Sequence, residues 1–239
     1  MKHKFKYSSF VCFNKKTIRC FAIFSLILII LSFAFSGIVA YSSSKYNGIT
    51  ILLDAGHGGR DGGSVGVNGT IEKEINLQYT LLLKQKLSKV GYRVELTRKN
   101  DDGLYSEFAQ NKKLSDMKAR FDIIKKTNPN LVISIHMNSF KNKNASGATT
   151  YYRKDDSASQ AVGDLVQKSL QTNCNAKYSH SKVGDYYILN CSHYTSILIE
   201  CGFISNPEEE NLLNTSAYKE KFTDAVMQGL LLYFGNASV

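Results

Sequence analysis

The strongest constraint on the fold is the stretch ITILLDAGHGGRDGG, from Ile49 to Gly63, where an apolar run passes abruptly into a glycine-rich loop. Branched apolar residues dominate 49–53, which is typical of a strand buried on both faces of a parallel sheet. Open α/β sheets bind ligands at the carboxyl ends of their strands. The glycines around His57 let the backbone turn tightly, so we expect its imidazole to face an open ligand site.

Two later apolar runs repeat this arrangement of a buried strand followed by a polar side chain. LVISI at 131–135 is followed by His136, and TSILI at 195–199 is followed by Glu200. Further strands are expected at 92–97, 147–152 and 186–189, and helices at 72–90, 115–126, 158–171, from Asn206-Pro207 onward, and at 217–234. Strands that alternate with helices in a chain of this length predict a single α/β domain, which we place at residues 49–236.

The chain before this domain divides into three segments of different composition. Residues 1–19 are basic, 20–41 contain no charged residue, and 42–48 are polar. An apolar helix of about 20 residues covers the roughly 30 Å hydrocarbon core of a bilayer. We therefore expect 20–41 to be a signal peptide or membrane anchor, with the anchor favoured. Residues 42–48 would then be a tether to a domain exported to the extracytoplasmic face.

The charge of the chain does not favour a nucleic-acid partner. The net charge of +10 includes six Lys and Arg residues before residue 20, so the remainder carries 24 basic and 20 acidic residues. Such a small excess weakens any nucleic-acid function and is compatible with an anionic polymer or membrane surface.

The cysteines do not indicate a disulfide framework. Cys174, Cys191 and Cys201 leave an odd number outside the leader and have none of the spacings of a structural zinc site. Proximity of Cys191 and Cys201 across neighbouring strands is an alternative, but we favour small apolar core residues.

The polar side chains after the buried strands have the composition of a catalytic zinc site. Such a site takes three protein ligands, typically imidazole and carboxylate, and leaves a position for water. His57, His136 and Glu72 would make this set, because the helix that follows the glycine loop starts at Glu72; Glu74, two positions on, would face elsewhere. Glu200 is then available as a general base.

Other residues have weaker claims to a site. His193 is a reserve ligand, whereas His3 and His180 lie among polar neighbours and are expected to be solvated. Arg98 and Arg120 either anchor a substrate carboxylate or pair with acidic loops. The glycine run matches neither the dinucleotide-binding nor the P-loop spacing, so nucleotide binding is not expected.

Five separated motifs resemble one known family. They are LLDAGHGGRDGGSVG, GTIEKEINL, Thr97-Arg98, ISIHMNS and ILIECGFISNPEE. In this order and spacing they are similar to the zinc-dependent N-acetylmuramoyl-L-alanine amidases of the type 3 amidase family, over roughly residues 49–234. The resemblance implies a twisted, mostly parallel sheet flanked by helices and one zinc ion per chain.

The resemblance also assigns roles to individual residues. It implies that His57, Glu72 and His136 hold zinc and that Glu200 is catalytic, in cleavage of the amide bond between N-acetylmuramic acid and L-alanine of peptidoglycan. Asn138 and Arg98 are expected as substrate contacts. The long loop after Arg98 and the membrane leader look most like the germination-specific amidases of endospore-forming bacteria, although Ala55 stands where the family usually has Pro.

That similarity implies a biological setting. The protein would act on the spore cortex ahead of muramic δ-lactam formation, attached to the membrane through its leader. No inserted helix that could plug the site is evident between Glu72 and His136, so control would fall to a separate activator protein. Two other functions stay open, namely a zinc peptidase that cuts within the stem peptide and a non-catalytic, membrane-tethered wall-binding protein.

Overall fold

The computed structural model describes residues 14–16, 19, 21, 23–28 and 46–236, and the chain divides into two compact units, Met1–Ser44 and Lys45–Val239. In the first unit, residues 23–28 are helical. Most of the predicted anchor at 20–41 and of the tether at 42–48 lies outside the described residues. Among those that are described, no helix is long and apolar enough to cross a membrane.

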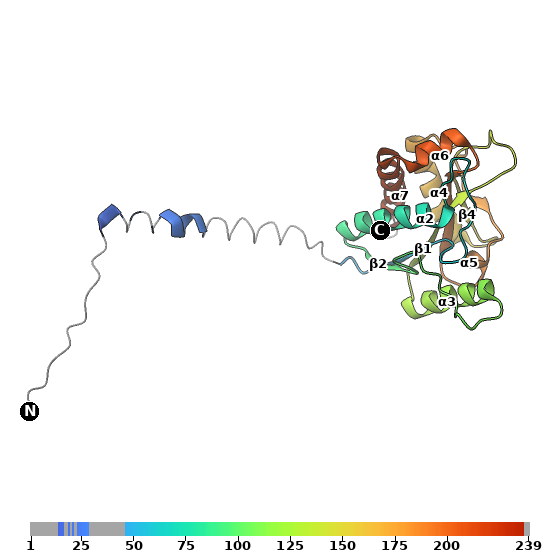
Figure 1. Cartoon of the computed structure of the whole chain (residues 1–239), viewed down its shortest axis with the longest axis horizontal. Helices are drawn as coiled ribbons and strands as arrows, with labels where there is room; N and C mark the ends of the chain where they lie inside the picture. The colour runs from blue at the N-terminus through green and yellow to red at the C-terminus, as the bar shows by residue number, and fades with distance from the viewer. Residues whose placement is uncertain (1–13, 17–18, 20, 22, 29–45, 237–239) are drawn as a thin grey trace, which may run out of the picture. The chain divides into compact units, whose positions relative to one another are not determined.

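The second unit is built on one six-stranded sheet (Figure 1). In sheet order its strands are β2 (Arg93–Leu96), β1 (Thr50–Ala55), β3 (Leu131–Asn138), β6 (Ser196–Phe203), β4 (Thr149–Tyr152) and β5 (Lys182–Val183). Neighbouring strands run parallel except β4 and β6, which are antiparallel. The sheet is therefore mixed, and the three apolar runs recognised in the sequence form its parallel centre, β1, β3 and β6.

Helices cover both faces of this sheet (Figure 1). They are α2 (Glu72–Lys89), α3 (Lys112–Thr127), α4 (Ser157–Cys174), α5 (Tyr187–Asn190), α6 (Pro207–Asn214) and α7 (Ser216–Asn236). On β1, Ile51 and Leu53 belong to the hydrophobic cluster of α2, α4 and α7, whereas Leu52 belongs to that of α3 and α5. Since successive strand residues point to opposite faces, burial on both faces requires the continuous apolar run.

One predicted strand is wrong. Residues 186–189 do not extend the sheet; Tyr187–Asn190 form the short helix α5, and the edge strand β5 lies earlier, at Lys182–Val183. Backbone hydrogen bonds close the helical turn, from Asn190 N to Tyr186 O at 3.2 Å and from Cys191 N to Tyr187 O at 2.8 Å. A four-residue apolar run has no period that distinguishes a strand from one turn of helix, so the sequence alone does not separate the two.

Two polar side chains lie within strands that extend beyond the apolar runs. β3 continues through His136 to Asn138, and β6 continues through Glu200 to Phe203. His136 and Glu200 are register partners, and the register shifts between His136 and Asn138. Backbone pairing thus continues where side-chain hydrophobicity stops, and it sets these two side chains on adjacent strands.

Candidate functional site

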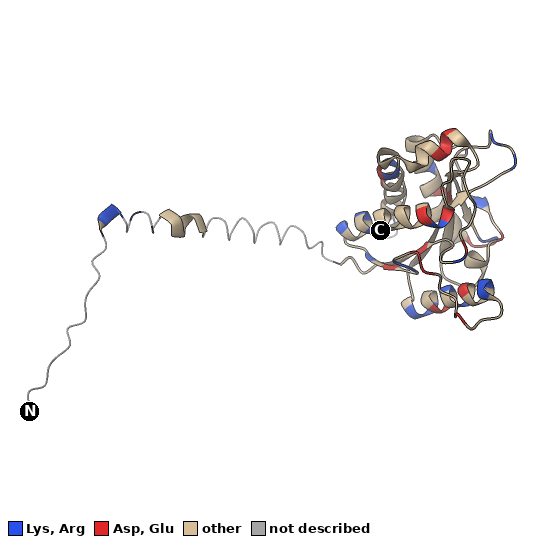
Figure 2. Ribbon diagram, in the orientation of Figure 1, with Lys and Arg blue, Asp and Glu red and all other residues tan. Residues whose placement is uncertain are grey.

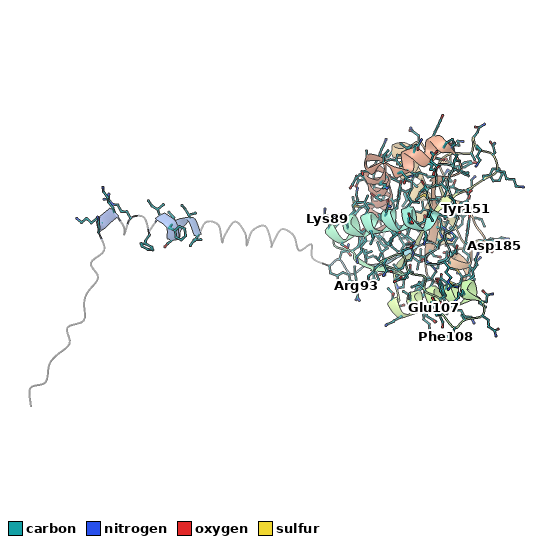
Figure 3. The ribbon with its side chains drawn as sticks, in the orientation of Figure 1. Lys89, Arg93, Glu107, Phe108, Tyr151 and Asp185 are labelled. Atoms are coloured by element: carbon teal, nitrogen blue, oxygen red, sulfur yellow. The ribbon has the colours of Figure 1, made fainter. Side chains whose placement is uncertain are left out.

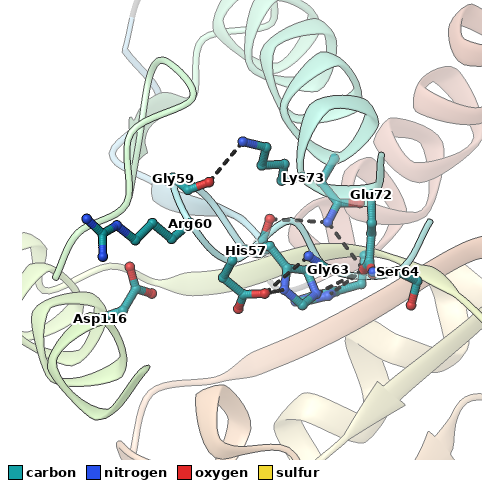
Figure 4. Close-up of polar contacts among 12 residues, drawn as sticks. His57, Gly59, Arg60, Gly63, Ser64, Glu72, Lys73 and Asp116 are labelled. Atoms are coloured by element: carbon teal, nitrogen blue, oxygen red, sulfur yellow. Dashed lines mark hydrogen bonds and ion pairs between the residues drawn. The ribbon is translucent and has the colours of Figure 1, made fainter. Parts of the chain in front are cut away.

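Three elements bring His57, Glu72 and His136 together. His57 follows β1 in the glycine loop, Glu72 is the first residue of α2, and His136 lies on β3. Glu72 Oε1 lies 3.2 Å from His57 Nε2 and 3.1 Å from His136 Nδ1. Each side chain offers one ligand atom, and the three atoms lie within 4.8 Å of one another (Figure 4 shows His57 and Glu72). Glu74 is exposed on the next face of α2, as expected.

Two glycines make room for these ligands. A Cβ on Gly56 would lie 2.2 Å from His136 Cε1, which is too close for any side-chain atom. A Cβ on Gly63 would lie 2.6 Å from Glu72 Oε2, and Gly63 also has a φ of +68°, which side-chain-bearing residues rarely adopt. The glycines of the loop therefore serve close packing of the ligand set as well as a tight turn.

The environment of Glu72 keeps it ionised. The carboxylate is 3% exposed, and its oxygens accept hydrogen bonds from Ser64 N at 2.8 Å and Met137 N at 3.2 Å. Burial alone would raise the pKa of Glu72, but the hydrogen bonds with His136 and His57 outweigh it and hold that pKa well below its usual value. A carboxylate between two imidazoles matches the set of ligands that zinc takes in catalytic sites.

His57 is held from its other side by an acid. Its Nδ1 lies 2.9 Å from Asp61 Oδ1. Burial opposes the charged imidazole, but Glu72 and Asp61 together raise the pKa of His57. A carboxylate on the far nitrogen of a ligand histidine fixes its orientation, as outer partners of metal ligands do.

Glu200 lies beside this cluster without joining it. It is 8% exposed, and its Oε2 is buried without a hydrogen-bond partner among the described residues. Burial raises the pKa of Glu200 to about 7. A buried carboxyl group with one unused oxygen and a pKa near neutrality is suited to accept and return a proton.

Two buried arginines donate hydrogen bonds to the backbone of the histidine loop, the glycine-rich loop that carries His57. Arg98 Nε donates to Ala55 O at 2.9 Å, and its Nη2 donates to Gly56 O at 3.0 Å. Arg120 Nη1 donates to Ala55 O at 3.1 Å, and its Nη2 donates to His57 O at 2.6 Å. Three successive carbonyls of the loop therefore accept hydrogen bonds from guanidinium groups.

A network of buried charges holds Arg120 in place. Its Nε donates to Asp116 Oδ2 at 2.7 Å, and its Nη1 donates to Asp54. Asp54 also accepts hydrogen bonds from Thr97 and Ser134, at 2.7 and 2.6 Å. Arg120 therefore pairs with acidic groups, which is one of the two alternatives that the sequence left open.

The positioning role of Asp54 has no signal in the sequence, because no spacing motif joins it to Arg120, 66 positions away.

The predicted substrate contacts lie differently from the ligands. Arg98 is 3% exposed and donates to four carbonyls, which favours a positioning role in the loop. Asn138 ends β3, and its carbonyl accepts from Ile204 N at 3.0 Å. Neither residue lines the cavity of about 270 Å³ that opens at His57 and His136. Substrate contact by these two residues stays a prediction.

The remaining histidines and cysteines lie away from the cluster. His193 is exposed and stacks on Tyr194, and the exposed His180 lies near Asp164; His3 lies outside the described residues. Cys174 and Cys191 are partly buried and Cys201 is buried, all as free thiols. Cys201 packs in the α2, α4 and α7 cluster and Cys191 against the α3 and α5 cluster, on opposite faces of the sheet.

The chain is similar to proteins of one known family. Residues 51–231 match the family described as N-acetylmuramoyl-L-alanine amidase. The chain is 30% identical to the germination-specific N-acetylmuramoyl-L-alanine amidase of Bacillus subtilis, over 88% of this chain and 91% of that protein. It is 32% identical to the probable cell wall amidase LytH of Staphylococcus epidermidis, over 82% of this chain and 62% of that protein.

A solved structure extends the comparison to the fold. The CwlD amidase of Clostridioides difficile, whose structure is a complex with the GerS lipoprotein, superposes with a TM-score of 0.75 and is 36% identical. The match covers 79% of this chain and 99% of that one. Because the family match includes all four residues of the site and nearly every element of the sheet, the chain belongs to the N-acetylmuramoyl-L-alanine amidase family.

Proposed function

We propose that this protein is a zinc-dependent peptidoglycan hydrolase that cleaves the amide bond between N-acetylmuramic acid and L-alanine of the stem peptide. The observation that carries the proposal is the convergence of His57, Glu72 and His136 within 4.8 Å, beside a Glu200 oxygen without a partner. Two imidazoles and one carboxylate fit zinc, which in catalytic sites takes three such ligands. One ion per chain would be bound.

The residues divide the chemistry between them. A zinc ion held by this set would supply Lewis-acid polarisation of the amide carbonyl and of water. Glu200 accepts the proton of the attacking water and returns it to the departing L-alanine nitrogen. Its pKa, raised by burial to about 7, suits both transfers near neutral pH. Asp61, Arg98 and Arg120 keep His57 in place. Asn138 is proposed as a substrate contact.

The relatives support a proposal for the biological setting. The similarity to a germination-specific amidase supports action on the spore cortex, ahead of muramic δ-lactam formation. The domain would work at the extracytoplasmic face, attached to the membrane through residues 20–41. A chain that starts at Ser44 should then lose membrane association and keep its zinc content. Recovery of that shortened chain in the membrane fraction would contradict the role given to the leader.

A separate protein partner is also proposed. The similar Clostridioides difficile amidase forms a complex with a lipoprotein, GerS. We expect the present chain to be assisted by a separate exported protein rather than by a segment of its own. Comparison of turnover by the purified chain alone and with candidate lipoproteins tests this; full activity of the chain alone would remove the need for a partner.

The reaction is tested by mass spectrometry of purified peptidoglycan after digestion with the zinc-loaded protein. An amidase releases peptides that begin with L-alanine and leaves glycan with free lactyl carboxylates. A peptidase that cuts within the stem would leave amino acids attached to muramic acid. A wall-binding protein without activity would change no mass. The Glu200→Gln variant is the control, since it should bind zinc and leave the peptidoglycan intact.

A further inference from the structure

A second hollow continues from the candidate metal centre along the start of α3. The first cavity, of about 270 Å³, opens at His57 and His136. The second, of about 240 Å³, is lined by Arg60, Tyr105 and Lys112. Asp61, Lys113 and Met117 line both cavities, so the two are contiguous. We call the second cavity the α3 subsite.

The acids of the α3 subsite are already engaged. Asp61 accepts from Gly63 N at 3.1 Å and lies 2.9 Å from His57 Nδ1. Asp116 accepts from Leu104 N at 2.7 Å and from Arg120. These carboxylates are thus used to hold the loop that carries His57 and the loop before α3.

The three cations of the α3 subsite differ in their partners. Lys112 pairs with Glu107 at 3.0 Å and lies over the Tyr105 ring (Figure 3 labels Glu107 and its neighbour Phe108). By contrast, among the described residues neither the Arg60 guanidinium nor the Lys113 ammonium has a hydrogen bond or ion pair, and each acts on an acid only at longer range, Arg60 on Glu107 and Lys113 on Asp61. The Arg60 side chain points away from His57 and Glu72, towards Asp116 on α3 (Figure 4).

The start of α3 adds to this positive potential. The helix begins at Lys112 after the N-cap Asn111, and its first turn contains no acid. A 16-residue helix carries partial positive charge at its amino end, which favours an anion there. Basic residues lie at both ends of α3 (Figure 2), and those of its last turn are Lys125 and Lys126, so Lys126 offers a matched position at the far end.

The side of the first cavity that lies away from the α3 subsite is lined by different residue types. Asp185, Tyr186, Tyr187 and Ile188 line it around the start of α5, and no cation lies among them. Tyr186 packs edge-on against Tyr151 at 5.3 Å between ring centroids. An aromatic wall beside an acid suits a sugar, whereas a carboxylate would be repelled from it.

We propose that Arg60 and Lys113 bind a carboxylate of the stem peptide, so that the peptide lies over the start of α3 and the muramic acid lies over α5. This inference rests on the proposed function, because it assigns the peptide half of that substrate to the α3 subsite and the sugar half to the α5 side of the first cavity. Charge complementarity of this kind gives orientation and specificity. Stem peptides that are amidated at this carboxylate would then be poorer substrates.

The test uses the zinc-loaded full chain and two muramoyl peptides that differ only in whether the carboxylate of the second amino acid is free or amidated. For the free acid, kcat/KM should fall about tenfold in Arg60→Gln and in Lys113→Gln, since each loses one charge-assisted hydrogen bond. The amidated peptide should show less than a twofold change. Lys126→Gln is the control and should leave both values unchanged.

A binding measurement separates this inference from the proposed reaction. Calorimetry with the free peptide should show about tenfold weaker binding in each variant, and weaker binding of the amidated peptide to the unaltered protein. Equal affinities throughout would overturn the α3 subsite even if the enzyme is active. Absence of turnover in the unaltered protein, together with selective binding of the acidic peptide, would reject the proposed reaction and leave the subsite standing.

Discussion

Arg120 Nη2 donates a hydrogen bond to the carbonyl of His57 at 2.6 Å, so helix α3 fixes the backbone of a proposed metal ligand that lies outside it. His57 needs this support, because its φ of +62° lies in the left-handed region that non-glycine residues rarely adopt. Such a conformation costs about 1 to 3 kcal/mol and persists only where its surroundings hold it. The buried charges of Asp54 and Asp116 in turn hold the guanidinium.

The first prediction concerns Arg120→Lys. A lysine keeps the charge, but one ammonium group cannot reach Asp54, Asp116 and the His57 carbonyl together. We expect zinc affinity to fall about 10- to 100-fold, the usual effect of losing an outer partner of a metal ligand. Competition with a chromophoric chelator measures this affinity. Arg93→Lys, at an exposed arginine on β2, is the control, and equal affinities in the two variants would refute the positioning role of Arg120.

The sequence predicted which polar side chains come together better than it predicted the groups that support them, for a physical reason. His57, Glu72 and His136 follow buried strands or start a helix, and hydrophobic periodicity locates those boundaries. Arg98 and Arg120 bind backbone carbonyls, which every residue offers, so no pattern identified their partners. The strand expected at 186–189 failed because the four apolar residues fit one turn of helix equally well. The central parallel strands were found because burial on both faces leaves a continuous apolar run.

The second prediction concerns Gly63→Ala. The new Cβ would lie 2.6 Å from Glu72 Oε2 and 2.8 Å from His57 Cδ2, so both side chains would have to move. Zinc affinity should fall at least about tenfold, since outer distortions of a metal site have effects of this size. Gly69→Ala is the control, because Gly69 has a φ of +91° but nothing within 4 Å of the added atom.

Both alanine variants should lose about 1 kcal/mol of stability from backbone strain, because both positions need a positive φ. Only Gly63→Ala should lose metal affinity. Thermal unfolding in the presence of chelator, together with metal titration, separates the two effects. A Gly63→Ala variant that binds zinc like the unaltered protein would show that the glycine is required for the turn alone.

The third prediction concerns stability in acid. Burial alone would raise the pKa of Asp54, but Arg120 and the hydroxyls of Ser134 and Thr97 outweigh it and hold that pKa below its ordinary value of 3.8. A group with a lowered pKa in the folded state contributes its stability above the unfolded value. That contribution is lost as the pH falls through the folded value. The metal-free protein should therefore lose stability below about pH 4.

Asp54→Asn tests this account. The variant leaves Arg120 without one buried partner, so at pH 7 its free energy of unfolding should fall by about 3 to 5 kcal/mol. Its further loss between pH 5 and pH 3 should be smaller than that of the unaltered protein. Urea unfolding across this range, with chelator present, measures both. Asp122→Asn, at an exposed position on α3, should follow the unaltered protein. Parallel pH profiles for Asp54→Asn and the unaltered protein would contradict the assignment.

The last prediction separates the two glutamates at the candidate metal centre. Glu72 contacts both histidines, whereas Glu200 keeps one buried oxygen without a partner among the described residues. Glu72→Gln replaces an anionic donor by a weak neutral one, so the variant should lose both zinc and activity. Glu200→Gln preserves shape and leaves the three ligands alone, so zinc content and thermal stability should stay near those of the unaltered protein.

The rate of Glu200→Gln should nevertheless fall by about 10² to 10⁴, the usual contribution of a positioned general acid or base. Metal content by atomic absorption and turnover on a muramoyl peptide must be measured on the same preparations of each variant. His136→Ala, which removes an imidazole ligand, provides the reference for zinc loss. Loss of zinc from Glu200→Gln, or a zinc-loaded and active Glu72→Gln, would mean that the roles of ligand and base are exchanged. Full activity in Glu200→Gln would instead place the proton transfer on another residue of the cavity.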